Sequence, residues 1–400
     1  MKTIENNIDA PVFEYNFPHD KQKILFFDIE TTGLSPKASS LYLIGAMYFD
    51  TSSEKWKLIQ WFADDYKSEA HIINSFLKLL EDFDYLYHFN GRTFDIPYLL
   101  SKCKKYKITP GSHCANIFND TSCIYSIDIL ALIRPLKKLL SIEKASQTDL
   151  ERWLSIKRTD EYNGGELITV YSKYMQNKII SPECAPELEN LLLLHNHDDI
   201  EQMLNVCSIL TYREIFSENN DITVFDIKES ENSEVTNIIE IYFKQNINIP
   251  KPITIKNALP PSKSDVLTSP DKISEPSVTL SLKNDIGILS CQVFRGILKN
   301  FYPNYKDYYY FPEEDTVIHK SLISSEIKKL SKKATASTCY TKKEGFFIPS
   351  GTTRSGDENI TQFYLTYHDK ICFYMLPNEI INPDNPFWNN YVIMQLSTFL

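Results

Sequence analysis

Two acidic residues, Asp28 and Glu30, end a strongly apolar stretch, Ile24-Leu25-Phe26-Phe27, just before the turn sequence Thr31-Thr32-Gly33. This pattern predicts a strand that is buried on both faces and then stops. Residues two apart on a strand share a face, so the two carboxylates are expected side by side. Burying both without compensation costs several kcal/mol or more, and a divalent cation would remove that cost. The alternative is an edge strand whose acidic side chains face water.

A second acidic candidate, Asp95, lies in the segment Asn90-Gly91-Arg92-Thr93-Phe94-Asp95-Ile96-Pro97. This segment joins a predicted strand, residues 85–89, to a helix that continues through Cys103. Asp95 falls in the first turn of that helix, where the helix dipole favours a carboxylate. It is therefore expected to be either an ordinary helix cap or a third acidic group of the same site.

A third candidate pair, His195 and Asp199, lies within residues 185–216, whose apolar spacing predicts a long helix. At about 100° per residue, both fall on the apolar stripe of that helix. A histidine on an apolar face is more often a buried core residue than a catalyst, but an aspartate one turn away can share a cavity with it. Asp198 lies about 100° away and is expected to be more exposed, so Asp199 is the preferred ligand. His197 lies on another face and ranks lower.

These three segments together resemble the three exonuclease motifs of the DEDD 3′-to-5′ exonuclease superfamily, in the same order. The match is strongest with its YprB-like ribonuclease-H-like branch, which three connecting segments also resemble. They are Ser126-Ile127-Asp128-Ile129-Leu130, residues 148–156, and Gly164-Gly165-Glu166-Leu167 with Tyr171. The resemblance covers residues 23–215, and three motifs in register indicate far more than one alone.

The resemblance implies a site for two ions of Mg²⁺ or Mn²⁺, held by Asp28, Glu30, Asp95 and Asp199, with His195 as the general base. Two such ions about 4 Å apart can activate a water and stabilise the leaving oxygen at phosphorus. Hard carboxylate oxygens suit these cations, and a neutral imidazole can accept a proton near pH 7. His195 precedes Asp199 by four residues, as in the tyrosine-bearing subgroup, whereas the histidine-bearing subgroup usually has five.

Substrate contacts are expected from three polar residues in or beside the motifs, Thr31, Thr32 and Asn90. Three lysines that follow Asp95 could steer phosphate groups, or could simply form a solvated helix face: Lys102, Lys104 and Lys105.

The element order predicts a mixed α/β fold, a ribonuclease-H-like mixed sheet flanked by helices, followed by a β-rich α+β C-terminal domain. Strands are expected at residues 24–30, 41–49 and 55–62 as an antiparallel meander, then at 85–89 and 126–130 between helices. The predicted domains are a flexible N-terminal arm, residues 1–22, a ribonuclease-H-like domain, residues 23–218, and a second domain, residues 219–400.

The second domain is predicted to carry strands near residues 238–243, 278–282 and 305–311, a proline-rich connection at 249–277 and an amphipathic helix at 317–330. Residues 291–343 hold ten Lys/Arg against five Asp/Glu, with six aromatic residues interleaved, namely Phe301, Tyr302, Tyr305, Tyr308, Tyr309 and Tyr310. Exposed aromatic and basic residues together can bind single strands, but strand aromatics are more often core. Nucleic-acid or partner binding is therefore one of two readings of this region.

Composition is consistent with a folded protein of two domains in the cytoplasm. The chain has 400 residues and a formal charge of −10, no apolar run of membrane-spanning length, and a polar amino terminus without a signal-peptide core. Its eight cysteines are scattered, without any Cys-x-x-Cys pair, which indicates reduced thiols rather than disulfides or a zinc site. The acidic charge excludes a simple basic coat protein for nucleic acid, but not a nuclease.

The first expectation for function is a metal-dependent 3′-to-5′ exonuclease acting on DNA or RNA, with single-stranded 3′ ends as substrate. No membrane contact is expected, and the sequence does not indicate which proteins it binds. The alternative is a ribonuclease-H-like nucleic-acid-binding module with little or no turnover. A structure-specific endonuclease on the same fold is a third possibility.

Overall fold

The computed structural model describes most of the chain: residues 1–111, 113, 124–160, 162, 164–232, 236–258, 277–350, 361–369, 371–377 and 382–399. The chain divides into two compact units, Met1–Arg213 and Glu214–Leu400, each with its own core. They are called unit 1 and unit 2 and are described separately.

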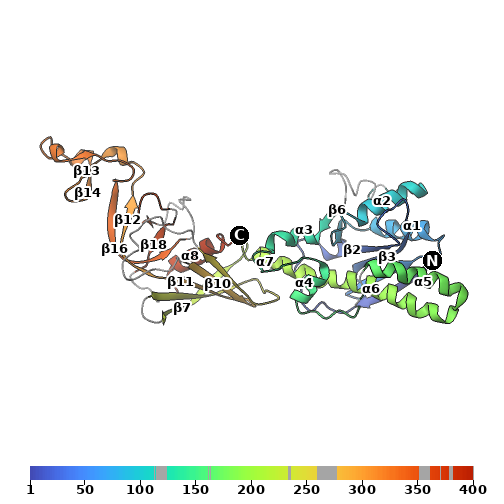
Figure 1. The fold of residues 1–400 in the computed structure, drawn as a ribbon. Helices are drawn as coiled ribbons and strands as arrows, with labels where there is room; N and C mark the ends of the chain where they lie inside the picture. The colour runs from blue at the N-terminus through green and yellow to red at the C-terminus, as the bar shows by residue number, and fades with distance from the viewer. Residues whose placement is uncertain are drawn as a thin grey trace. The chain divides into compact units, whose positions relative to one another are not determined.

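Unit 1 is built on a six-stranded mixed sheet with the order β1-β4-β3-β2-β5-β6 (Figure 1). Its strands are β1 (Lys2–Ile8), β2 (Ile24–Thr31), β3 (Leu41–Asp50), β4 (Lys55–Phe62), β5 (Tyr85–His88) and β6 (Tyr125–Asp128). The first four spatial neighbours pair antiparallel, while β5 is parallel to both β2 and β6. The predicted antiparallel meander of three strands in a mixed sheet is confirmed.

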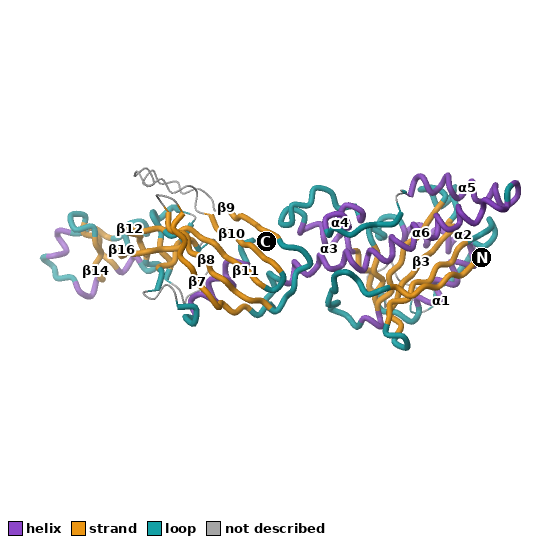
Figure 2. The backbone as a smooth tube through the Cα atoms, turned by 90° about the horizontal axis from the view of Figure 1, so that it is seen from below, coloured by secondary structure: helices purple, strands orange, loops and turns teal. Residues whose placement is uncertain are grey.

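Helices cover both faces of this sheet. The helices of unit 1 are α1 (Glu69–Leu80), α2 (Asp95–Tyr106), α3 (Ile129–Ile133), α4 (Gln147–Trp153), α5 (Gly164–Ile180), α6 (Ala185–Val206) and, continuing into unit 2 by one residue, α7 (Thr211–Glu214). On one face Phe27 of β2 stacks on Phe76 of α1, with ring centroids 5.2 Å apart. On the other face α6 crosses β2, β3 and β4, as Figure 2 shows from below. Alternate residues of β2 therefore contact different helices.

The close approach of α6 to the sheet depends on Gly45 of β3, which pairs with Asp28 in the β2–β3 register. A Cβ atom at Gly45 would lie 2.1 Å from Cδ1 of Ile200 and 2.2 Å from Oδ1 of Asn196, both on α6. The absence of a side chain at this position lets α6 contact the sheet beside Asp28.

One prediction for unit 1 is wrong. Residues 1–22 are not simply a loose arm, because Lys2–Ile8 forms β1 along the full length of β4. The strand was missed because it lies at the sheet edge, where only Ile8 is buried and the other side chains are polar or partly exposed.

Unit 2 is rich in strands, as predicted. A five-stranded antiparallel sheet, in the order β7-β8-β11-β10-β9, is formed by β7 (Ile222–Asn232), β8 (Thr236–Gln245), β9 (Ile253–Ala258), β10 (Ser277–Lys283) and β11 (Ile286–Gln292). A four-stranded sheet contains β12 (Phe294–Phe301), β16 (Tyr340–Pro349), β17 (Gln362–Phe363) and β18 (Phe373–Met375). The last helix, α8 (Pro386–Leu396), buries Trp388 and Tyr391.

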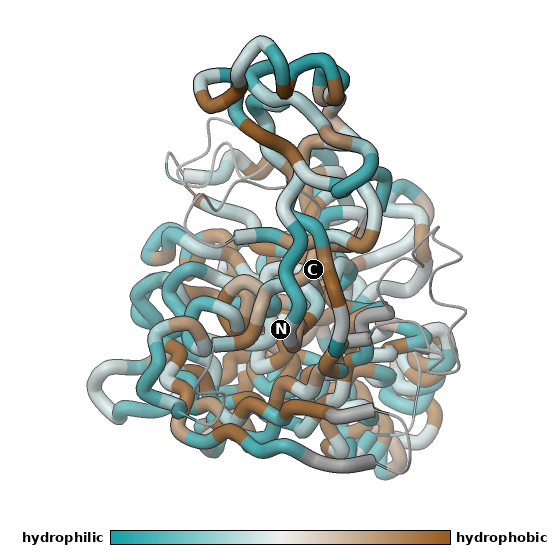
Figure 3. The backbone as a smooth tube through the Cα atoms, turned by 90° about the vertical axis from the view of Figure 1, so that its left-hand side faces the viewer, coloured by the Kyte–Doolittle hydropathy of each residue, from teal (hydrophilic) through white to brown (hydrophobic). Residues whose placement is uncertain are grey.

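Between β12 and β16 lies a small three-stranded sheet of β13 (Tyr308–Phe311), β14 (Thr316–His319) and β15 (Lys332–Lys333). Residues 302–339, called the tip, form this excursion, which lies at the end of the β12–β16 hairpin (Figure 1). In Figure 3 the tip is uppermost and combines hydrophilic and hydrophobic stretches.

The predicted helix at residues 317–330 is wrong. Thr316–His319 pairs with β13 as a strand, and only short 3₁₀ turns follow, at Lys320–Leu322 and Ile327–Leu330. The apolar residues Leu322 and Leu330 are both 77% exposed, so no buried face exists to stabilise a helix there. Part of the predicted 249–277 connection is also a strand, β9, and residues 259–276 lie outside the described residues.

Across the described ranges, none of the helices combines the length and apolar character needed to cross a membrane. The six cysteines within the same ranges are free thiols, whereas Cys114 and Cys123 fall outside them.

Candidate active site

The first part of the site is the end of β2. Asp28 and Glu30 occupy alternate positions of this strand and so share the face that α6 covers. Glu30 is buried and Asp28 is partly buried. The carboxylate of Asp28 accepts a hydrogen bond from Nδ2 of Asn196 at 3.1 Å, which links the strand directly to α6.

Asp95 joins this pair from the first residue of α2. The backbone N–H of Ile29, the residue between Asp28 and Glu30, donates a hydrogen bond to the carboxylate of Asp95. Within β2, only Ile24–Phe26 pairs with β5, so the amide of Ile29 lies beyond the end of the β2–β5 pairing. The tight turn into α2 requires Gly91, because a Cβ there would lie 3.1 Å from Oδ2 of Asp95 and 2.9 Å from Cγ of His88.

α6 supplies the remaining candidate residues. His195 points its Nε2 atom at both other segments, 3.6 Å from Oε1 of Glu30 and 3.3 Å from Oδ2 of Asp199. One ligand atom from each of Glu30, His195 and Asp199 lies within 4.8 Å of the others. The four-residue spacing therefore does not prevent His195 from reaching the acidic cluster.

The electrostatics show how crowded the carboxyl groups are. Burial raises the pKa of Asp28 well above its usual range, and the charges of Asp95, Asp199 and Glu30 raise it further. Burial, then Asp199 and Asp95, act on the pKa of Glu30 in the same direction. Burial raises the pKa of Asp95 to about 7, although the Ile29 amide opposes the shift. The charge of Asp199 acts on all three of these carboxyl groups, which links them in one electrostatic unit.

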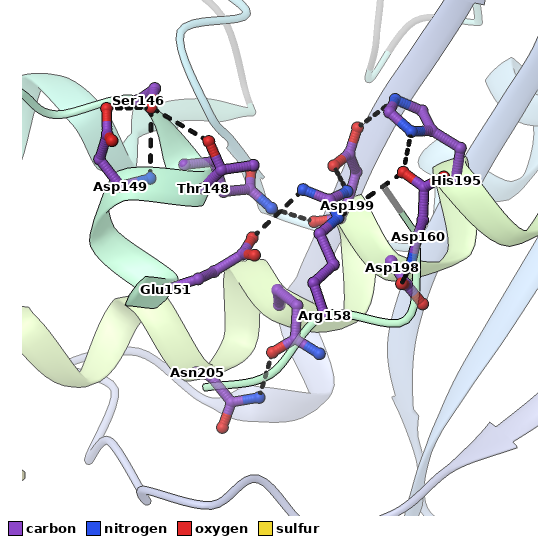
Figure 4. Close-up of polar contacts among 12 residues, drawn as sticks. Ser146, Thr148, Asp149, Glu151, Arg158, Asp160, His195, Asp198, Asp199 and Asn205 are labelled. Carbon is purple, nitrogen blue, oxygen red and sulfur yellow. Dashed lines mark hydrogen bonds and ion pairs between the residues drawn. The ribbon is translucent and has the colours of Figure 1, made fainter. Parts of the chain in front are cut away.

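Two functional candidates in the loop before α5 were missed by sequence reasoning. Asp160 is buried, and its Oδ2 lies 2.5 Å from Nδ1 of His195. Arg158 forms a close ion pair with Asp199, and its guanidinium also lies 3.6 Å from Glu151 (Figure 4). Arg158 is therefore the cation that partly balances the acidic cluster. No motif spacing marks these residues, because the loop has neither strand nor helix periodicity.

The predicted exposure of Asp198 is wrong. Asp198 is 5% exposed, whereas the side chain of Asp199 is 21% exposed. The carboxylate of Asp198 accepts the backbone N–H groups of Thr159 and Asp160 at 3.1 and 2.9 Å, so the loop covers this side of the helix. Asp198 thereby holds Asp160 next to His195, while Asp199 faces Glu30 across His195.

The three predicted substrate contacts, Thr31, Thr32 and Asn90, have partners within the protein. Thr31 donates its hydroxyl to the carbonyl of Gly33 at 3.0 Å, and the hydroxyl oxygen of Thr32 accepts from the amide of Ser40 at 2.8 Å. Asn90 has a φ of 60°, and its backbone N–H donates a hydrogen bond to Oδ1 of Asp128 at 3.0 Å. These bonds shape the two turns beside the site, and substrate contact by the three residues stays a prediction.

Of the three lysines of α2, Lys102 differs from both expectations, whereas Lys104 and Lys105 are exposed, as expected of a solvated helix face. Lys102 is fully buried and lies 2.7 Å from Glu69 of α1, so it fastens the two helices together instead of facing solvent or phosphate. Lys105 is 48% exposed and lies 3.6 Å from the same carboxylate. Lys104 is exposed.

The donor set fits a divalent cation. Glu30 and Asp199 lie beside one imidazole, and Asp28 and Asp95 interact electrostatically with Asp199. Hard oxygen donors of this kind prefer Mg²⁺ or Mn²⁺. Bound cations would allow all four groups to ionise at neutral pH. For Asp199 to act as a ligand, Arg158 must give up at least part of its contact with that carboxylate.

Residues 25–211 match the family model of the RNase H superfamily. This segment is an RNase H-like domain. The match confirms the predicted ribonuclease-H-like fold class and covers every candidate residue of the site.

Among solved structures, 55 chains match. One is the family B DNA polymerase of the archaeon Pyrobaculum calidifontis, with a TM-score of 0.37 and 14% identity over 56% of this chain and 35% of the polymerase chain. Another is an Exonuclease I from Methylocaldum szegediense, with a TM-score of 0.28 and 11% identity over 66% of this chain and 64% of that one. No curated protein matches the chain.

Proposed function

We propose that the RNase H-like domain is a metal-dependent 3′-to-5′ exonuclease that hydrolyses phosphodiester bonds of DNA or RNA. The observation that carries the proposal is that Glu30 of β2 and Asp199 of α6 both lie beside His195. Asp28 of β2 and Asp95 of α2 interact electrostatically with Asp199 and so belong to the same acidic cluster. A purely structural role does not explain this arrangement, because clustering buried carboxylates destabilises a fold unless cations bind there.

Asp28, Glu30, Asp95 and Asp199 would hold two Mg²⁺ or Mn²⁺ ions. When bound, such ions lower the pKa of an attacking water and stabilise negative charge on the phosphoryl and leaving oxygens. Two ions, rather than one, are inferred from the resemblance of the motifs to the DEDD exonucleases, and the number of carboxylates is compatible with that.

In this proposal His195 accepts the proton of the attacking water at Nε2, the nitrogen that faces Glu30 and Asp199. Asp160 accepts the hydrogen bond of Nδ1–H, which leaves the lone pair on Nε2 and stabilises the imidazolium that forms. Asp160 is thus a positioning residue. Arg158, beside Asp160 and Asp199, limits the negative charge of the group.

Polarity and substrate rest on narrower grounds. The 3′-to-5′ direction and a preference for single-stranded 3′ ends follow from the resemblance of the three motifs, in their order, to the DEDD superfamily. Both DNA and RNA are retained as substrates, because contact with a 2′-hydroxyl group is what distinguishes them at such a site.

The test is digestion of single- and double-stranded DNA and RNA, labelled at one end, by the full chain with Mg²⁺, with Mn²⁺ and with EDTA. We expect stepwise shortening from the 3′ end only with metal. Asp28→Ala should abolish cleavage with little loss of stability, because one of several crowded charges is removed. Asp50→Ala is the matched control, since Asp50 is at the other end of β3 and partly exposed, and should retain activity.

Three outcomes would contradict the proposal in different ways. Binding of the oligonucleotide without shortening would indicate a binding module. Cutting of a circular or end-blocked substrate would indicate an endonuclease. Cleavage that persists in Asp28→Ala would show that the activity resides elsewhere.

A further inference from the structure

The tip of unit 2, residues 302–339, has two faces with different chemistry. On strand β13 the side chains of Tyr308 and Tyr310 lie on one face and that of Tyr309 on the other. The first face is structural. Its Tyr310 hydroxyl donates to Asp315 at 2.8 Å, and Asp315 also contacts Tyr340 and Lys342 of β16. These contacts attach the tip to the hairpin that carries it.

The Tyr309 face is basic. Nζ of Lys328 lies 5.0 Å from the centroid of the Tyr309 ring, and Lys333 is the residue of β15 that pairs with Tyr309. The pKa of the Tyr309 hydroxyl is below its usual range because Lys328 hydrogen-bonds to it and Lys333 and Lys320 lie near. Three ammonium groups therefore gather around one partly exposed tyrosine.

These charges are largely unbalanced. Residues 320–333 contain five lysines and one glutamate, a net charge of +4 on a chain whose formal charge is −10. Lys320 pairs with Asp307 at 2.7 Å. Within the described ranges, no carboxylate lies within 4.0 Å of the other four, Lys328, Lys329, Lys332 and Lys333. A cluster of like charges without counterions inside the fold attracts anionic ligands from solution.

We propose that the Tyr309 face of the tip binds the phosphate backbone of single-stranded nucleic acid. A chain of phosphates offers repeated negative charges to several lysines at once, and Tyr309 supplies a partly exposed ring and a hydroxyl beside them. The choice of nucleic acid as the ligand rests on the proposed nuclease function of unit 1. The basic character of the face does not depend on that function.

The test measures binding by fluorescence anisotropy, with a labelled single-stranded oligonucleotide of about 20 nucleotides, long enough for one site. EDTA is present, so cleavage cannot occur and the result is independent of nuclease activity. The double variant Lys328→Gln/Lys333→Gln is expected to weaken binding about tenfold and to reduce the slope of log Kd against log salt by about 1.4. The same double substitution at Lys256 and Lys283, exposed lysines of β9 and β10, is the control and should change neither.

An unchanged Kd and salt slope in the Lys328→Gln/Lys333→Gln variant, with an unchanged melting temperature, would overturn the proposal. The exposed side chains of Leu322 and Leu330, together with the lysines of the tip, would also suit binding to an anionic lipid membrane. Sedimentation with phosphatidylserine vesicles is therefore measured in parallel, and tip-dependent vesicle binding without oligonucleotide binding would likewise overturn it. Oligonucleotide binding through the tip without any cleavage in Mg²⁺ or Mn²⁺ would support this proposal and contradict the nuclease function.

Discussion

Arg158 brings positive charge into the acidic cluster. Its side chain is 12% exposed and contacts Asp199, Glu151 and Asp160. Burial lowers the pKa of Arg158. The nearby carboxylates, Asp199 first among them, raise it, and the net shift is upward. The guanidinium thus takes a place that a divalent cation would compete for.

We expect Arg158→Gln to destabilise the metal-free protein by about 3–5 kcal/mol, because it leaves partly buried carboxylates without a cation. The same change should strengthen Mn²⁺ binding, since a competing charge is gone. Thermal melting with EDTA and with added Mn²⁺ measures both effects. Arg152→Gln removes a 75% exposed arginine from nearby α4 and should alter neither. Equal Mn²⁺-induced shifts in wild type and Arg158→Gln would contradict this role.

His88 makes the stability of the protein depend on pH in the acidic range. It is buried at the end of β5, accepts the Gly91 amide at Nδ1 and contacts the Ser126 hydroxyl through Nε2. Burial lowers its pKa from 6.5 to about 4, outweighing the opposite effect of Asp128. A proton on Nδ1 would displace the Gly91 amide from the turn that leads to Asp95.

Because the unfolded chain takes up this proton at a higher pH than the folded chain, the contribution of His88 to stability is present above pH 6.5 and is lost as pH falls toward 4. The loss reaches roughly 3 kcal/mol. The raised pKa of Asp95 acts in the opposite direction, so the informative quantity is the difference between wild type and His88→Gln. We expect that difference in unfolding free energy to shrink from pH 7 to pH 4, whereas His71→Gln, on the exposed side of α1, should show a constant difference.

At this scale the sequence identified the acidic residues and His195 through their apolar surroundings and spacing. It could not identify Asp160 or Arg158, since their roles arise from contacts across about 35 to 40 positions of the chain. The error at Asp198 has a related cause. A helical wheel gives the direction of a side chain but not the loop that packs over it, here residues 159–160.

At the scale of elements, the contact between α6 and β3 fixes the geometry of the site. Asn196 binds Asp28 through its amide nitrogen, and its oxygen accepts from Gln60 of β4 at 2.9 Å. His195 and Asp199 flank Asn196 on the same helix. Any change that lifts α6 from the sheet therefore moves the proposed ligand on α6 relative to those proposed on β2.

Gly45→Ala is expected to make such a change, since its methyl group would overlap Asn196 and Ile200. Overpacking of this kind costs about 1–3 kcal/mol, and Mn²⁺ affinity, measured by isothermal titration, should fall with it. Gly287→Ala on β11 is the matched control, because its methyl group would lie 2.1 Å from Cζ of Phe243 in unit 2. That variant should lose stability but keep its Mn²⁺ affinity. A Gly45→Ala protein with normal Mn²⁺ affinity would contradict the role given to this contact.

Strands and helices with strong periodicity were predictable, including β2 to β4 and α6. Weakly patterned elements were not. β1 is polar because it lies at a sheet edge, and β14 was taken for part of a helix because its few apolar residues also fit helical spacing. In both, pairing with another strand decides the structure: β1 pairs with β4, far along the chain, and β14 pairs with β13 across a turn.

On the scale of the whole molecule, the chain has two cores. Unit 1 buries aromatic residues such as Phe27 and Phe76 between sheet and helix, and unit 2 buries Trp388 and Tyr391 of α8. A ligand that binds only unit 1 stabilises only that unit directly.

Calorimetry of the full chain should show two transitions, of which Mn²⁺ raises one. At about 100 times its Kd, Mn²⁺ adds ~3 kcal/mol, a shift of roughly 5–10 °C for a unit of this size. Gly287→Ala should lower the other transition and thereby assign both. If Mn²⁺ raised neither transition, or raised the one that Gly287→Ala lowers, the location of the site in unit 1 would be wrong.

The amide of Ile29 has a consequence for sequence variation at that position. Its N–H donates to Asp95 from between two other acidic residues, so one main-chain group ties all three together. Side-chain exchange at position 29 leaves this donor in place, and proline alone among the encoded residues removes it. An ester in place of this amide, introduced by chemical synthesis, would remove the N–H donor to Asp95 and leave every side chain of the protein unchanged.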